Sequence, residues 1–185
     1  MKKLFDSPVF ALLLAAVVMF GTMLISTKVD FGKKCRRLTE HFYAGSDNTG
    51  AVAADLRTLC QSAEQLAGIG QQLGLDEAEK TLQAADEMRN LLYVQTQNLN
   101  SVNAVYHDLL TSTFALEQAL ARAELSDAQK ETVAAAQSSA AAAKASIDAS
   151  DFNDSARVFL RRYQKFPTVG LAGMVGVNMP CVFNG

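Results

Sequence analysis

The chain has 185 residues, with 17 Lys and Arg side chains against 19 Asp and Glu, so its formal net charge is −2. Within residues 38–147 there are six basic against fourteen acidic side chains, which excludes the basic face that a nucleic-acid-binding protein needs. The three cysteines are odd in number and far apart, which fits reduced thiols better than a disulfide framework.

The first predicted element is the uncharged apolar stretch 9–25, which as a helix would be about 26 Å long, near the lower limit for crossing a bilayer. A cleaved signal peptide is an alternative, because Lys2 and Lys3 supply a basic start. However, the apolar core is long and no A-x-A cleavage site follows it. A buried core helix is a second alternative, and it would be unusual because the stretch is apolar on every face. We therefore predict a retained membrane anchor in residues 1–27.

The charges that flank this stretch predict its orientation. Lys2 and Lys3 precede it, whereas five basic residues follow within a dozen positions, so the positive-inside rule favours a cytoplasmic location for the rest of the chain. An extracytoplasmic domain is the alternative. The five residues expected beside the lipid headgroups are Lys28, Lys33, Lys34, Arg36 and Arg37.

Residues 28–167 are predicted to form a helical bundle domain. The anchor helix should continue to about Tyr43, where the turn-rich residues 45–50 end it. Apolar residues spaced three and four apart then predict a helix from Val52 to Leu73, with Gly74 as its C-terminal cap. Short turns predict that successive helices alternate in direction.

The longest periodic segment runs from Leu75 to Leu125 without Gly or Pro and predicts one helix of almost fifty residues, about 70 Å long. Asp76 and Glu79 have the spacing of a capping box at its start. Polar Gln95 and Thr113 interrupt the apolar seam and are expected to set its register. Because the preceding helix is about half as long, an elongated hairpin is expected beyond a shorter bundle.

Ser126 and Gln129 predict a second capping box, which begins an alanine-rich helix. The apolar phase slips near residues 148–151, so a break is expected there, and Pro167 should end the last helix. The apolar tail 168–185 then rests either on lipid and the emerging anchor or on the core of the bundle. Four basic residues are expected to return to the membrane with this end: Arg157, Arg161, Arg162 and Lys165.

No strand pattern occurs, so the predicted fold class is all-α: a single N-terminal transmembrane helix that continues into an elongated antiparallel bundle of long helices. The two histidines, His41 and His107, are on different predicted helices, and no metal, phosphate-binding or nucleophile motif is found. The sequence therefore predicts no catalytic residues, no metal ligands, no cofactor and no enzymatic activity.

The C-terminal residues resemble the motif of the bacterial LemA family, as a divergent member. Phe152-Asn153, Phe159 and Phe166-Pro167 match its aromatic-Asn pair, its second aromatic and its Phe-Pro pair. The resemblance implies a single-pass membrane protein with a helical bundle and supplies no catalytic residues. We expect a membrane-anchored scaffold or adaptor whose partners are the lipid bilayer and a protein or a second copy of the chain. An extracytoplasmic sensor or binding module is the alternative.

Overall fold

The computed structural model describes residues 8–46, 49–163 and 180–183, and every regular element among them is a helix. The all-α prediction is therefore confirmed for this part of the chain. The helices are α2 (Pro8–Ala44), α3 (Val52–Gln72), α4 (Glu77–Tyr93), α5 (Leu99–Leu120), α6 (Asp127–Asp148) and α7 (Asp151–Tyr163).

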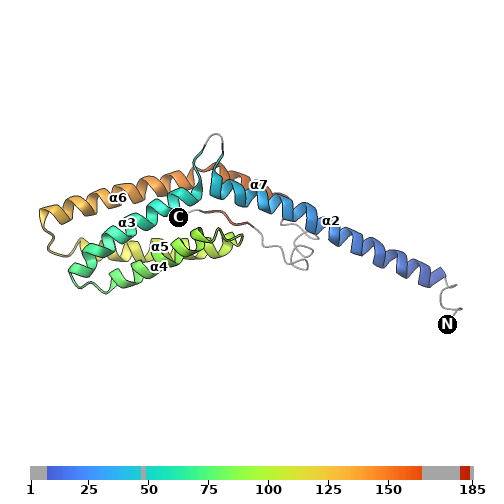
Figure 1. The fold of residues 1–185 in the computed structure, drawn as a ribbon, viewed down its shortest axis with the longest axis horizontal. Coiled ribbons are helices and arrows are strands. Elements are labelled where there is room, and N and C mark those ends of the chain that lie inside the picture. Colours follow the sequence, from blue (N-terminus) through green and yellow to red (C-terminus); the bar gives the residue numbers. More distant parts are fainter. Residues whose placement is uncertain (1–7, 47–48, 164–179, 184–185) are drawn as a thin grey trace.

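Helix α2 is continuous over 37 residues, about 55 Å, and its first part projects away from the remaining helices (Figure 1). Most of its large apolar side chains from Leu12 to Ile25 are exposed to the surroundings. This helix is long and apolar enough to cross a membrane, a property that anchors and signal sequences share. From Phe31 onward α2 has a buried face, so the predicted continuation of the apolar helix to about Tyr43 is confirmed.

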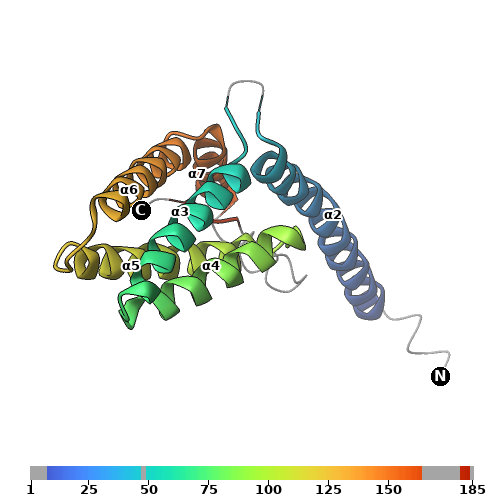
Figure 2. The same cartoon turned by 60° about the vertical axis from the view of Figure 1, so that its left-hand side comes forward.

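The other five helices pack together, with α3 at the centre against α4, α5 and α6 (Figures 1 and 2). The prediction that α3 folds back along α2 is wrong. Beyond the turn that follows Ala44, α3 continues away from the N-terminus (Figure 1). Helix α7 is the element that runs alongside α2 (Figure 1), and both α3 and α7 contact α2.

The predicted fifty-residue helix is also wrong, because the chain turns at residues 94–98 and α5 packs back against α4. Gln95 has the positive φ of 47° that ends α4, and the Thr96 hydroxyl accepts a hydrogen bond from the backbone N–H of Asn98 at 3.2 Å. The turn is held to α2 by Tyr43, whose hydroxyl donates to the Thr96 carbonyl at 3.1 Å. Because α4 and α5 fold back on each other, each helix buries its apolar face. The elongated hairpin that we expected therefore does not form.

Two of the other helix ends differ from the predictions: α5 ends at Leu120 instead of near Leu125, and the cap expected at Asp76 does not form. Gly74 has a φ of +71° and donates to the Gln71 carbonyl, and the Leu75 N–H reaches the Gly70 carbonyl, which together close α3 as expected. The capping box of Ser126 and Gln129 forms at α6, and the break between α6 and α7 falls at residues 149–150. No capping box forms at Asp76, because its backbone is helical and its side chain makes no cap hydrogen bond.

Helix α7 runs back along the second part of α2, and aromatic rings join the two helices. The Phe31 ring lies 5.1 Å from that of Phe159 and 5.4 Å from that of Tyr163, while Phe42 lies 5.5 Å from Phe152. The end of α7 thus lies beside α2 near Phe31, six residues beyond the apolar stretch. The return of this end to a membrane stays a prediction. The predicted helix end at Pro167 lies outside the described residues.

Candidate functional site

Helices α5 and α6 are separated by a gap on the surface of the bundle. Both helices pack on α3, but they scarcely touch each other, so α3 forms the floor between them. The half of this gap nearer α2 is closed by residues 180–183, and the other half is open.

Phe183 closes the first half. Its side chain is 0% exposed, with ring centroids 5.2 Å from Phe42 and 5.9 Å from both Tyr106 and Phe152. The buried side chain of Asn153 holds its backbone: Nδ2 donates to the Phe183 carbonyl at 2.6 Å, and the Phe183 N–H donates to Oδ1 at 2.8 Å. These two bonds reproduce the pairing of neighbouring strands with a side-chain amide, so this short extended segment is fixed in the core.

This placement decides between the two interpretations of the tail for the residues that can be seen. Phe183 packs in the core of the bundle and against α2, so its predicted contact with lipid is wrong. Val182 and Cys181 pack beside the core and are half-buried. The membrane interface could not have supplied the paired hydrogen bonds that Asn153 provides. The remainder of the tail, residues 168–179, lies outside the described residues.

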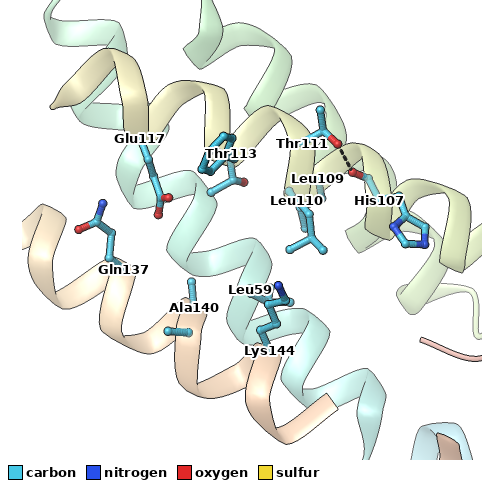
Figure 3. Close-up of a pocket in the computed structure, with 12 residues that line it drawn as sticks. Leu59, His107, Leu109, Leu110, Thr111, Thr113, Glu117, Gln137, Ala140 and Lys144 are labelled. Carbon is cyan, nitrogen blue, oxygen red and sulfur yellow. Dashed lines mark hydrogen bonds between the residues drawn. The ribbon is translucent and has the colours of Figure 1, made fainter. Parts of the chain in front are cut away.

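The second half of the gap is an open groove of about 660 Å³ (Figure 3). Leu59 of α3 lies at its base, with Leu109 and Leu110 of α5 on one side and Ala140 of α6 on the other. Phe114 also lines the groove and is 60% exposed, a large apolar side chain without full cover. The groove thus combines an apolar base with polar side chains, and binding grooves use such polar groups to orient a ligand.

Polar side chains occupy both ends of the groove. Glu117 of α5 and Gln137 of α6 face each other at one end, and His107 and Lys144 lie at the other (Figure 3). Burial raises the pKa of Glu117, and hydrogen bonding with Gln137 lowers it in part. The groove therefore has an acidic end and a basic end, which would orient a bound segment.

A second candidate surface is the cleft between α2 and α7, of about 460 Å³. Three of the predicted membrane-proximal residues line it together: Lys34, Arg37 and Arg162. The others do not join them: Lys28, Lys33, Arg36 and Arg161 are exposed outside the cleft, and Arg157 pairs with Asp154 at 3.0 Å. Lys165 lies outside the described residues.

The residues of the LemA-like motif are structural wherever they can be seen. Phe152 and Phe159 are buried in the core, and Asn153 makes the hydrogen bonds to Phe183 described above. Phe166 and Pro167 lie outside the described residues. In the described part the motif therefore joins α7 to α2 and to the C-terminal segment.

The described residues hold no group of three or more His, Cys, Asp or Glu side chains that could bind a metal ion. Burial raises the pKa of the Cys60 thiol to about 11 and that of Cys181 to about 12. Both thiols are therefore protonated near neutral pH, when the thiolate is the nucleophilic form. The structure therefore does not favour covalent catalysis by Cys60 or Cys181.

Sequence reasoning missed the groove, because it arises where two helices that both pack on α3 stand apart from each other. One signal was available: Phe114 lies beside Thr113, where the apolar seam is interrupted, and a large apolar residue off the seam marks a second apolar face. Comparison of the chain with models of protein families, with characterised proteins and with solved structures gives no significant match.

Proposed function

We propose that this protein is a membrane-anchored adaptor without catalytic activity, which holds its bundle at the cytoplasmic face of a bacterial membrane and binds an amphipathic helix of a partner protein. The observation that carries the proposal is the open groove between α5 and α6, on a bundle attached to a helix long and apolar enough to span a bilayer. The resemblance of residues 152–167 to the LemA motif supports the anchored arrangement.

The shape of the groove favours a helix as its occupant. Residues 107–117 of α5 line one side over about 15 Å, three helical turns. An amphipathic helix laid between α5 and α6 would cover Leu110 and Phe114 with its apolar face and leave its polar face in water, which is a common mode of peptide recognition. A basic residue near Glu117 and an acidic residue near Lys144 would match the two ends.

A photoreactive phenylalanine analogue, introduced separately at position 114 and at position 93, tests this proposal in living cells. Tyr93 is the matched control, because it is 86% exposed and lies outside the groove. We expect a discrete protein adduct from position 114 and none from position 93. The adduct should disappear when Ala141, an exposed residue of the groove wall, is changed to Glu.

The same experiment separates the alternatives. An adduct that consists of two copies of the chain would identify self-association through the groove and replace the partner helix. Equal adducts from positions 93 and 114, or none from 114, would contradict docking in the groove.

A further inference from the structure

The cleft between α2 and α7 combines positive charge with apolar surface in a way that the proposed adaptor function does not use. Lys34 and Arg37 line it from α2 and Arg162 lines it from α7, against the single carboxylate of Asp154. Asp154 is paired with Arg157, and Lys34 is paired with Asp30 of its own helix at 3.4 Å, which leaves Arg37 and Arg162 as the excess cations. The cleft thus has a surplus of positive charge, which favours an anion over a cation as its ligand.

The positive groups are held in place by the ring of Tyr163. The Lys34 ammonium donates to the Tyr163 hydroxyl at 2.7 Å, and the Arg162 guanidinium lies 5.7 Å from the centre of the ring. Tyr163 in turn packs edge-on against Phe31 at 5.4 Å. Because one core-anchored aromatic side chain positions two cations from different helices, the cleft is partly organised before any ligand arrives.

Apolar side chains complete the cleft. Leu38 and Phe159 form buried parts of its wall, whereas Val158 is 64% exposed and lies among the cations. A free anion in water gains nothing from such a neighbour, but the glycerol and upper acyl chain of a phospholipid would cover it. This mixture of charge and apolar surface favours a lipid over a soluble phosphate.

The position along α2 agrees with a lipid. Lys34 lies nine residues beyond Ile25, about 13 Å along the helix. The headgroup layer extends roughly 5–7 Å beyond the hydrocarbon, and the Debye length at physiological ionic strength is about 8 Å. The cations of the cleft are therefore within electrostatic reach of headgroup phosphates, and a tilt of α2 towards α7 would bring them into contact.

We infer that the cleft between α2 and α7 binds the phosphate-bearing headgroup of an anionic phospholipid through Lys34, Arg37 and Arg162. This inference rests on the anchored arrangement of the proposed function, but it does not depend on the groove or its partner. Binding there would hold α7 down on the membrane surface and fix the bundle, together with its groove, in one orientation.

Native mass spectrometry of the full-length chain, extracted from membranes in detergent micelles, tests the inference. Phosphatidylglycerol and phosphatidylcholine are titrated separately, and the bound lipid is counted. The cleft variant carries Lys34→Gln, Arg37→Gln and Arg162→Gln. Its control carries Lys33→Gln, Arg36→Gln and Arg161→Gln, which removes the same charge from the same two helices outside the cleft.

Three cations, each worth roughly fivefold near an anionic surface, predict that the cleft variant loses up to about 100-fold in affinity for phosphatidylglycerol. The control variant should lose little, and binding of phosphatidylcholine should not change. Equal losses in both variants, or none in either, would overturn a defined site. Displacement of phosphatidylglycerol by glycerol 3-phosphate at equal concentration would overturn the lipid as ligand.

A second variant covers the case in which loss of the Lys34 hydrogen bond disturbs folding. Val158→Asp places a carboxylate in the cleft from an exposed position, and Val94→Asp is its exposed control at the turn between α4 and α5. Only Val158→Asp should weaken phosphatidylglycerol binding; equal effects would contradict the inference. The intact mass in the same spectra reports whether residues 1–27 are retained, so failure of the anchor is distinguished from failure of the lipid site.

Discussion

The two ends of the bundle have cores of different composition. Near α2 the buried cluster includes the rings of Phe31, Phe42, Tyr106, Phe152, Phe159 and Phe183. Away from α2 a separate buried cluster consists of Leu, Ile, Val and Ala side chains. Near α2, Phe183 from the chain's own C-terminal segment packs among the aromatic rings. The open groove lies farther along α5 and α6, between the aromatic cluster, which contributes Leu59 and Leu109, and the aliphatic cluster. The comparison teaches that a gap between helices is a binding site only where the chain does not fill it itself.

Removal of the Phe183 side chain should give the largest effect. Phe183→Ala would leave a cavity among three other rings and is expected to lower the free energy of unfolding by about 3–5 kcal/mol. Phe114→Ala at the open end should change it by less than about 0.5 kcal/mol, because that side chain is mostly exposed. Chemical denaturation of the full-length protein in detergent, followed by circular dichroism, measures both; similar losses would remove the distinction between the two ends.

Asn153 tests whether the closed end depends on hydrogen bonding as well as on packing. Asn153→Leu would leave unpaired the N–H and carbonyl of Phe183. It would also remove one hydrogen bond to the Ile147 carbonyl, which still accepts from Ser150. We expect a loss of about 2–4 kcal/mol and faster hydrogen exchange in residues 180–183. Asn90→Leu, on an exposed position of α4, is the control and should cost no more than about 0.5 kcal/mol. A tolerated Asn153→Leu would mean that the aromatic packing alone fixes the segment.

Two glycines of α3 probe the packing of the aliphatic end. A Cβ added at Gly70 would lie 2.9 Å from Leu116 Cδ1 and 3.0 Å from Ala78 Cβ, so Gly70→Ala should cost about 1–2 kcal/mol net of its better helix propensity. A Cβ at Gly68 meets nothing within 4 Å, and Gly68→Ala should stabilise by about 0.5–1 kcal/mol. Thermal unfolding of the pair gives the sign directly. Stabilisation by both substitutions would show that the aliphatic end is loosely packed throughout.

The smallest effect is expected at Glu117 in the open groove. Burial raises its pKa above the ordinary value of 4.5, so ionisation of this carboxyl costs stability in the folded state at neutral pH. Glu117→Gln should therefore raise the Tm by about 1 °C at pH 7. The gain should fade as the pH drops through the raised pKa and vanish below 4.5, where the carboxyl is neutral in both states. A gain that persists at low pH would contradict burial as its cause.

Local signals in the sequence predicted the helices whose ends are set by local chemistry. Three such signals are Gly74, the Ser126 capping box and the phase slip before Asp151. Each acts within one or two helical turns, so the helix end that it sets can be predicted without knowledge of the rest of the fold. The apolar positions of the long segment were also correct, since Met88, Leu92, Leu99 and Leu109 are all buried.

The turn between α4 and α5 could not be predicted from the sequence. Its apolar repeat continues in phase across residues 94–98 without Gly or Pro, and the energy that favours the turn comes from packing α5 on α4 and α3. The polar run from Gln95 to Asn98 was the available signal, because Asn often precedes the first turn of a helix. Phe183 was equally hidden, since its buried partners lie in helices far apart in the sequence.

Selective labelling of one introduced cysteine tests the central claim, that a retained anchor holds the bundle in the cytoplasm. Cys60 is only 3% exposed, so Ser138→Cys on the exposed face of α6 is the better reporter, with the unaltered chain as the background control. A membrane-impermeant maleimide should leave the Ser138→Cys protein unlabelled in intact cells and label it after the inner membrane is permeabilised. Labelling in intact cells with only the outer membrane opened would place the bundle outside the cytoplasm and contradict the account.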